Sequence, residues 1–447
     1  MKRHWALTVA AVCCAGMAWT LPAAAQGNSP QQKPDKAEYV KHYQDPVLKA
    51  MEDRDKKQNE AAEAKTKAID KEQKALEKAR KKERKDLRFD MSHIRKPASP
   101  DAFTVKHWFF PPVPQYLTGT CWDFSTTSFL ECEANRLSGV KVKLSEMWTA
   151  YHEYLLKAEG YIATRGHSVF DEGSESNAVL RVWKKWGVVP EKDFPGTCVP
   201  GQKYDHSQMI VEMQNYLKYC KSHNYWNQKQ ILATLEIIMQ KYMGVPPKAA
   251  HYQGKTYTPK QFLHDVLKIN PDDYVSFMST ESIPFWTKGE YRVPDNWWHS
   301  KNYYNVPLNV WYATLVKAVK AGSTVAIGGD VSEPGYNGFE DAAIIPSFDI
   351  PQAWINQDAR EFRIYDHTTT DDHGVQVVGW THLGDHDWFL IKDSARASRH
   401  GKFKGYMFYR DDYVKMKMRT YMVNKQFVKD VLKQFKPEPA KQEHAHK

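Results

Sequence analysis

One cysteine of the chain has the surroundings of a nucleophile. The stretch reads Gln115-Tyr-Leu-Thr-Gly-Thr-Cys121-Trp, and a helical pattern follows Cys121 as far as Gly139. A cysteine in the first turn of a helix lies near free backbone N–H groups and the positive end of the helix dipole, and both favour the thiolate. The amide of Gln115 can donate a hydrogen bond to an oxyanion. A buried structural cysteine is the alternative interpretation.

The predicted helix after Cys121 has a start signal and an apolar face. Thr120 and Asp123 have the spacing of an N-cap residue and its third-position acid. The apolar residues of the helix recur at helical spacing, and Gly139 is a typical stop. We therefore expect one buried face, formed by Phe124, Phe129, Leu130 and Leu137.

This stretch resembles the papain-like cysteine peptidases, which have a glutamine, a short turn, Cys-Trp and then Phe-Ser. It is most similar to the bleomycin hydrolase and bacterial aminopeptidase C branch, in which the turn before the cysteine lacks an extra cysteine, as Thr118 does here. The similarity extends over roughly residues 100 to 425, and the further stretches that carry it are 144–147, 187–191, 271–276 and 370–374.

The resemblance implies an α+β fold with two lobes, a helical lobe and a β-rich lobe, joined by a helical insertion. It also implies hydrolysis of peptide bonds through a Cys-His-Asp site without a cofactor, with a peptide or protein as substrate. Aminopeptidase action is typical of that branch, in which the chain's own C-terminus limits cutting to the N-terminal end of the substrate.

A cysteine nucleophile needs a base and a group that orients the base. His373 begins a predicted strand and Asp393 follows another, so the two side chains can meet side by side. The resemblance assigns the base to His373 and the orienting role to Asp393, where the family usually has asparagine. A carboxylate also accepts the imidazole N–H, and its charge favours the imidazolium. The family's Asn-Ser-Trp-Gly is here Asp393-Ser-Ala-Arg, so the tryptophan that shields the histidine contact is missing.

The resemblance also implies substrate contacts at Trp122, Gly173, Ser174 and Asp372. The family has a pair of glycines along which the substrate backbone lies, and the second of them is Ser174 here. A small residue still permits close approach. For Asp372, a loop carboxylate in water is the alternative interpretation.

A metal site is the competing interpretation of His367, Asp371, Asp372 and His373. Neighbouring residues of one loop rarely all turn to one ion, so we expect neither a metal nor another cofactor.

The composition is that of a globular protein with substantial cores. The chain has 447 residues, of which 42% are hydrophobic, and a net charge of +10 that lies largely before residue 100. Only Cys121, Cys132, Cys198 and Cys220 follow the first segment, so disulfides do not build the fold. The sequence leaves open whether Cys198 and Cys220 form a disulfide.

Six segments are expected along the chain. A basic start, an apolar run and three alanines at 23–25 predict a secretory signal peptide, hence an exported, periplasmic or secreted protein. The segments are the signal peptide 1–25, a basic helical arm 26–100, the helical lobe with the nucleophile 101–200, a mostly helical insertion 201–304, the β-rich lobe 305–435 and a disordered tail 436–447.

Two segments allow a binding role besides their structural one. The arm is rich in alanine, glutamate and lysine; a solvated helix is the simple interpretation, and contact with an anionic surface is the alternative. The insertion is rich in tryptophan and tyrosine, which favours core packing over a ligand platform. No specific nucleic acid is expected, and a homo-oligomer is compatible with the sequence.

We therefore predict a cysteine peptidase, with aminopeptidase action as the first hypothesis. An endopeptidase of the same fold is one alternative. The other is a non-catalytic, peptidase-like binding or scaffold protein, which the altered Asp393-Ser-Ala-Arg segment motivates.

Overall fold

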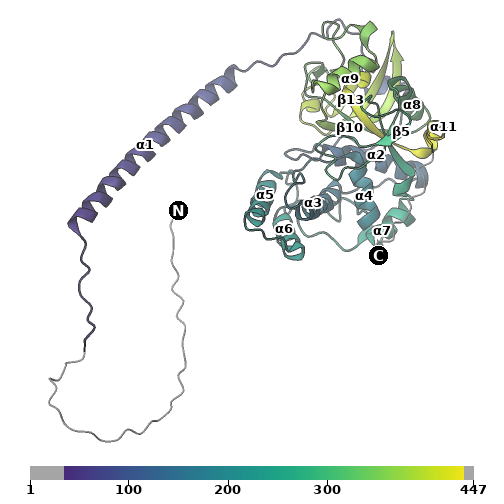
Figure 1. Cartoon of the computed structure of the whole chain (residues 1–447). Coiled ribbons are helices and arrows are strands. Elements are labelled where there is room, and N and C mark those ends of the chain that lie inside the picture. The colour runs from purple at the N-terminus through teal and green to yellow at the C-terminus, as the bar shows by residue number, and fades with distance from the viewer. Residues whose placement is uncertain (1–34, 437–447) are drawn as a thin grey trace, which may run out of the picture. The chain divides into compact units, whose positions relative to one another are not determined.

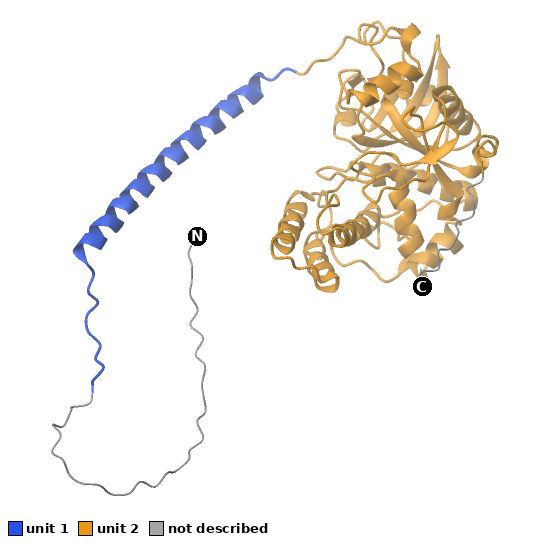
Figure 2. Ribbon diagram, in the orientation of Figure 1, with its two compact units in different colours: residues 1–85 blue, residues 86–447 orange. Residues whose placement is uncertain are grey.

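The computed structural model describes residues 35–436. The chain divides into two compact units, residues 1–85 and residues 86–447 (Figure 2). The predicted signal peptide, residues 1–25, lies outside the described residues, as does all but the first residue of the predicted tail.

The first unit contains the helix that we predicted in the basic arm, α1 (Pro46–Glu83). The Asp45 carboxylate caps its start, and none of its residues is buried. The helix is stabilised by residues of high helix propensity and by ion pairs one turn apart, such as Lys56 with Glu60 at 4.0 Å. Within residues 35–436 we find no helix with the length and apolar character needed to cross a membrane.

In the second unit, three helices of the predicted nucleophile lobe belong to the first core, together with buried side chains of residues 209–269 (Figure 1). They are α2 (Cys121–Ser138), α3 (Glu146–Ala163) and α4 (Ser176–Trp186). Helix α2 is buried on nearly all sides from Trp122 to Ala134, because it lies between the other helices and the sheet. The predicted stop is correct: Gly139 ends α2 in the left-handed conformation, at φ 71°. Leu137 was wrongly placed on the buried face, since its side chain is 40% exposed.

The insertion, which we predicted to be mostly helical, begins with two helices, α5 (Ser207–Ser222) and α6 (Gln228–Met243). A turn with Asn224 at φ 50° separates them. A further helical segment begins as α7 (Pro259–Gln261), where Thr258 and Gln261 form a capping box. It continues as a π-helical turn over Phe262–Val266.

The β-rich part is one 11-stranded sheet in the order β5-β6-β4-β13-β7-β10-β11-β12-β9-β8, with β1 also on β10. The middle of the sheet holds the strands that position the site, and most of their neighbours run antiparallel to them. These strands are β4 (Tyr274–Met278), β7 (Val325–Gly329), β10 (His373–Leu383), β11 (His386–Lys392), β12 (Tyr406–Arg410) and β13 (Met418–Asn424). The outer strands are β1 (Val105–Lys106), β5 (Thr287–Gly289), β6 (Tyr303–Asn305), β8 (Tyr336–Asn337) and β9 (Ala342–Ala343).

The segment predicted as a mostly helical insertion contributes to this sheet. Strand β4 pairs with β13, and β6 extends the sheet beyond β4. Strand β4 is buried throughout, so its residues carry no alternation of polar and apolar side chains that would have marked it as a strand. A separate hairpin, β2 (Ala250–Tyr252) with β3 (Lys255–Tyr257), lies in the same segment.

Short helices close the second core against the sheet. The largest of its fully buried side chains include Trp311 and Tyr421, whose ring centroids are 4.9 Å apart. The helices are α8 (Leu308–Lys320), α9 (Gln357–Tyr365), α10 (Asp411–Lys417) and α11 (Lys429–Leu432). A third, smaller core holds Met91 and Phe103, so the chain from residue 86 onward already packs against the sheet.

Candidate active site

Cys121 is the first residue of α2 and is partly exposed. The hydrogen bonds of the helix begin with the N–H groups of Asp123 and Phe124, which both donate to Thr120 O, at 3.0 and 3.1 Å. The N–H groups of Cys121 and Trp122 precede these bonds and lie at the positive end of the helix dipole. The helix therefore holds the sulfur where negative charge is favoured.

The predicted capping pair does not form. Thr120 is the N-cap residue, but its side chain accepts no bond from the helix and instead meets the Thr118 hydroxyl at 2.6 Å. Asp123 is fully buried and accepts from the Thr127 hydroxyl at 2.6 Å. Burial raises the pKa of the Asp123 carboxyl well above its ordinary value. Its place inside the core, rather than at the helix surface, explains why it cannot reach back to the N-cap.

His373 begins β10 and pairs with Gly329 of β7. Its side chain is 8% exposed, and its Nε2 lies 2.8 Å from Asp393 Oδ1. Nδ1 is the ring nitrogen that remains for the thiol of Cys121, the second hydrogen-bond partner of the imidazole. The structure thus brings together the three side chains predicted as nucleophile, base and orienting group.

Asp393 follows β11 directly and is 2% exposed. Oδ1, which faces His373, also accepts from Ala395 N at 2.7 Å, and Oδ2 accepts from the Tyr336 hydroxyl at 3.1 Å. These donors fix the carboxylate, so that it in turn fixes the plane and the protonated nitrogen of the imidazole. Tyr336 was not among the predicted residues, because a two-residue strand far from Asp393 in the sequence gives no signal of this contact.

The electrostatics of the pair favour the charged form of both side chains. Burial alone would lower the pKa of His373, but the charges of Asp393 and Cys121 and the hydrogen bonds to both raise it well above its ordinary value. Burial alone would raise the pKa of Asp393, but His373, Ala395 N–H and the Tyr336 hydroxyl hold it below its ordinary value. The site therefore favours a charged imidazolium beside an ionised Asp393.

Gln115 lies in the loop before Cys121 and is tied to the segment after Asp393. Its Oε1 accepts from the Ser394 hydroxyl at 2.7 Å, and its backbone N–H donates to Ser394 O at 3.0 Å. Its Nε2 donates to Thr118 O at 2.6 Å. An amide nitrogen carries two hydrogens, so this arrangement orients the group and leaves a second N–H for an oxyanion.

No protein-family profile matches the chain, and no curated protein matches it. Among solved structures, the chain is similar to PepW from Lactobacillus rhamnosis HN001. The two are 16% identical, the likeness covers 74% of this chain and 84% of PepW, and the TM-score is 0.61. The fold is papain-like. In this papain-like fold the helix that begins at Cys121 and the strands that carry His373 and Asp393 belong to the two lobes that the resemblance implied.

Two of the predicted substrate contacts are sequence neighbours of the nucleophile and of the base. Trp122 is buried, and its Nε1 donates to Glu172 O at 3.1 Å. Asp372 is exposed, and its Oδ1 accepts from Val331 N at 3.0 Å, while Oδ2 accepts from the Ser332 hydroxyl. Their contact with a substrate stays a prediction.

The other two predicted contacts lie under the insertion. Gly173 accepts a hydrogen bond from Lys157 on its carbonyl, and its Cα faces the carboxylate of Asp295. Ser174 is 5% exposed and donates to Glu153 Oε1 at 2.8 Å. Both residues are therefore covered by neighbouring side chains and are not openly accessible to a substrate. Their contact with a substrate also stays a prediction.

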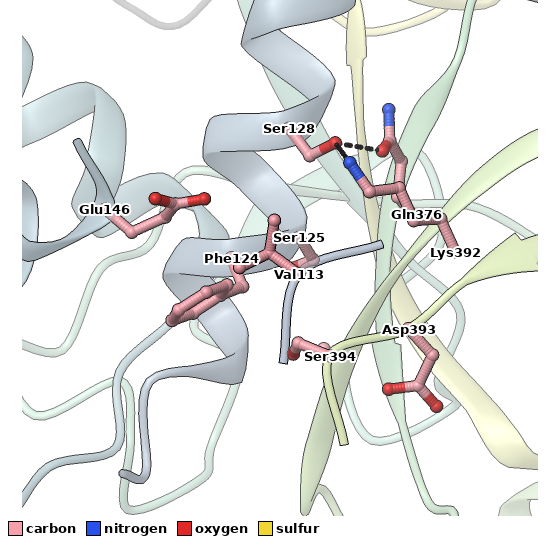
Figure 3. Close-up of a pocket in the computed structure, with 10 residues that line it drawn as sticks. Val113, Phe124, Ser125, Ser128, Glu146, Gln376, Lys392, Asp393 and Ser394 are labelled. Carbon is pink, nitrogen blue, oxygen red and sulfur yellow. Dashed lines mark hydrogen bonds between the residues drawn. The ribbon is translucent and has the colours of Figure 1, made fainter. Parts of the chain in front are cut away.

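Three buried polar side chains form a hydrogen-bonded tie between the same three elements that carry the predicted catalytic residues. Lys392 Nζ donates to the Ser128 hydroxyl, which donates to Gln376 Oε1, both at 2.6 Å (Figure 3). Ser128 lies on α2 with Cys121, Gln376 on β10 with His373, and Lys392 directly precedes Asp393. Because the three side chains are almost fully buried, the tie limits sliding of α2 against the sheet.

The remaining cysteines lack the setting of Cys121. Cys132 is buried and accepts from Gln376 Nε2 at 3.2 Å, and burial raises the pKa of its thiol to about 11. Cys198 and Cys220, which we left open as a disulfide, are both free thiols; Cys198 is exposed and Cys220 is buried. Burial raises the pKa of Cys220 as well.

The side chains that the competing interpretation assigned to a metal site contact different partners. His373 turns to Asp393, Asp372 to Val331 and Ser332, and Asp371 to Glu175. Within residues 35–436 no group of three or more histidine, cysteine or acidic side chains is placed to hold a metal ion.

The aromatic residues of the insertion are packed and not exposed as a platform. Trp297 donates to Glu153 Oε1 at 2.8 Å, and Arg181 lies over the rings of Trp297 and Trp298. Tyr291 and Tyr303 are buried with their ring centroids 5.4 Å apart. This confirms the prediction of core packing.

Proposed function

We propose that the protein is a cysteine peptidase that hydrolyses peptide bonds with Cys121 as nucleophile, His373 as base and acid, and Asp393 as the residue that orients His373. The observation that carries the proposal is the buried contact between His373 Nε2 and Asp393 Oδ1 at 2.8 Å, with Cys121 as the other partner of the imidazole. The likeness to PepW supports the fold on which these residues stand.

The proposed reaction has two halves. In the first, the Cys121 thiolate attacks the carbonyl carbon, and the carbonyl electron pair moves to oxygen, facing the Cys121 N–H and the Gln115 amide. The tetrahedral intermediate then collapses to a thioester, the C–N bond breaks, and the His373 imidazolium gives its proton to the leaving amine.

In the second half, water attacks the thioester while His373 accepts its proton. The C–S bond breaks, the carboxylic acid leaves and the thiolate–imidazolium pair is restored. Asp393 stays ionised throughout and keeps the ring turned toward Cys121.

Covalent labelling tests this proposal. Purified protein is treated with a vinyl-sulfone or epoxide probe and its sites of modification are mapped by mass spectrometry. We expect rapid modification at Cys121, loss of both labelling and peptidase activity in Cys121→Ala, and no loss in Cys198→Ala, which removes an exposed thiol outside the site. Peptidase activity that persists in Cys121→Ala would overturn the proposal.

The non-catalytic alternative makes the opposite prediction. A peptidase-like scaffold would bind peptides without turnover, and Cys121 would react with the probe no faster than Cys198. The raised pKa of His373 beside Cys121 favours the enzyme, because a charged imidazole is what an activated thiolate needs.

Aminopeptidase action is the finer form of the proposal, and an endopeptidase is its alternative. The resemblance to the aminopeptidase C branch supports the first. Profiling on peptides with free and with acetylated N-termini separates the two, because an endopeptidase cuts both.

We also propose export, with cleavage after Ala25, and contact of the arm with an anionic surface. The basic end of the arm, from Lys78 to Lys85, motivates the second point. Mass spectrometry of the mature N-terminus tests the first. Vesicles containing anionic lipid, titrated with salt, test the second, since electrostatic binding weakens as ionic strength rises.

A further inference from the structure

One carboxylate of the insertion lies directly beside the predicted substrate ledge, which consists of Gly173 and Ser174. A Cβ atom at Gly173 would lie 2.3 Å from Asp295 Oδ2 and 2.5 Å from its Oδ1, so the Asp295 carboxylate occupies the space beside this glycine. The ledge adjoins the nucleophile, because Glu172 O accepts from Trp122 Nε1 at 3.1 Å. Asp295 therefore stands beside Gly173, close to the start of α2.

The segment that carries Asp295 is held firmly in place. Asn296 Nδ2 donates to Tyr291 O at 2.9 Å and to Ser300 O at 3.1 Å, and Asn296 Oδ1 accepts from Ser300 N at 3.0 Å. These bonds close residues 291–300 into a compact loop.

The same loop is bound to the helical lobe through one buried carboxylate. Glu153 accepts from Trp297 Nε1 at 2.8 Å, from the Ser174 hydroxyl at 2.8 Å and from Arg181 at 2.6 Å. The neighbour of Asp295 and the ledge residue Ser174 thus share one anchor. Asp295 cannot move away from the ledge without breaking this network.

Acidic side chains outnumber basic side chains around this point. Asp295 interacts with Lys157 but also with Asp171 and Asp371, and burial is the main reason why its pKa is raised to about 6. Asp371 lies two residues before His373 and contacts Glu175. Arg181 and Arg419 are the other cations of this region, and both already face carboxylates.

A second observation points to a missing hydrogen-bond donor. Glu175 is 6% exposed, and among the described residues its Oε1 has no hydrogen-bond donor. Glu175 shares a hydrogen bond with Asp371 and also interacts electrostatically with Asp295, so its carboxyl group faces the same point. Burial and the neighbouring Asp371 raise the pKa of Glu175 well above its ordinary value. A buried carboxyl oxygen without a donor is costly, and a bound ammonium group would supply one.

We infer that Asp295 closes the ledge and binds the free α-ammonium group of the substrate's N-terminal residue. This inference rests on the proposed function, because the resemblance places the substrate backbone along Gly173 and Ser174. A substrate that continued past this point would have to pass through the space of the Asp295 carboxylate. The exopeptidase limit then belongs to the insertion, and the protein removes residues from a free N-terminus.

Three matched substrates test the inference on the wild-type protein. They are an aminoacyl-aminomethylcoumarin, its N-acetyl form and a blocked tripeptide form with the same final residue. We expect turnover of the first and at least 100-fold lower kcat/KM for the other two. Equal turnover of free and acetylated forms would overturn the inference.

Variants then separate charge from shape. Asp295→Asn keeps the volume and removes the charge, so we expect KM for the free amine to rise at least tenfold with kcat within threefold. Asp295→Gly empties the space, so we expect turnover of the N-acetyl substrate to appear. Glu290→Gln, on the same segment, whose carboxylate meets His299 at 2.8 Å, is the matched control and should behave as wild type. An unchanged KM in Asp295→Asn would refute the role of the charge.

The labelling of Cys121 keeps this test distinct from that of the proposed function. A protein that reacts with the vinyl-sulfone probe and cuts all three substrates alike is a peptidase without the Asp295 limit. A protein that neither reacts nor turns over any substrate removes the proposed function, and the inference falls with it.

Discussion

Replacement of Asp393 by asparagine tests the electrostatics of the site with little change of shape. Oδ1 of the new side chain can still accept from His373 Nε2 and Ala395 N, the contacts now at 2.8 and 2.7 Å. Its Nδ2 would take the place of Oδ2 at 3.1 Å from the Tyr336 hydroxyl, which can rotate to accept. The fold and the orientation of the ring should therefore survive.

What changes is the charge beside the imidazole. A hydrogen bond to a charged group contributes about 1.5–3 kcal/mol and a neutral one about 0.5–1.5 kcal/mol, so the imidazolium loses roughly 1–1.5 kcal/mol relative to the neutral ring. Because 1.36 kcal/mol corresponds to about one pKa unit, the pKa of His373 should fall by about one unit. It would fall from a value that is raised well above the ordinary one.

The sign of the effect on activity follows from the active form. The thiolate–imidazolium pair is lost when His373 gives up its proton, so a lower pKa moves the alkaline limb of kcat/KM to lower pH. We expect a shift of about one unit in Asp393→Asn and a larger loss of activity in Asp393→Ala, which has no acceptor. Profiles of kcat/KM against pH for the three proteins measure both.

Stability should change in a defined pH window. His373 has a raised pKa in the folded protein, so its contribution is full below about pH 6.5 and is lost as the pH rises through the folded value. Asp393 has a lowered pKa, so its contribution is present above about pH 3.9 and is lost as the pH falls through the folded value. Asp393→Asn should therefore lower the free energy of unfolding most between about pH 4 and 6.5.

Two results would refute this reasoning. An alkaline limb that stays in place or moves upward in Asp393→Asn would show that the carboxylate does not hold the proton of His373. Full activity of Asp393→Ala at every pH would show that Asp393 does not orient the ring.

Three further substitutions have expected outcomes. Tyr336→Phe leaves a buried oxygen of Asp393 without its donor and should lower stability by about 1–3 kcal/mol in urea denaturation. Ser128→Ala removes the hydroxyl between Lys392 and Gln376 and should cost about 1–3 kcal/mol, with a lower Tm as the readout; an unchanged Tm would contradict the tie. Gly173→Ala pushes a methyl group against a carboxylate and should cost about 1–3 kcal/mol, measured by denaturation beside activity on a free-amine substrate.

Local patterns predicted the elements of the site well. The helix that begins at Cys121, its stop at Gly139 and the strands next to His373 and Asp393 follow from hydrophobic spacing and turn residues, which are properties of short stretches. The contact of His373 with Asp393 was predictable because both lie at strand ends.

Contacts set by the tertiary fold were not predictable. Tyr336 reaches Asp393 only because β8 and β11 lie in the same sheet, and no short pattern encodes this. Thr120 is the N-cap residue, as its position predicted, but the capping bonds with Asp123 do not form because Asp123 is buried in the core. The three strands that the insertion adds to the large sheet were missed because β5 and β6 are short and β4 lacks alternation.

The order of strands in the sheet also has a consequence for synthesis of the chain. Strand β13 (Met418–Asn424), close to the end of the described residues, lies between β4 and β7. Strand β7 in turn pairs with β10 at His373. A chain that leaves the ribosome N-terminus first can assemble the helices early. Its sheet, however, lacks β13 until almost the whole chain has been made. Nascent chains should therefore be inactive, and the peptidase chemistry proposed here would begin only after translation is nearly complete.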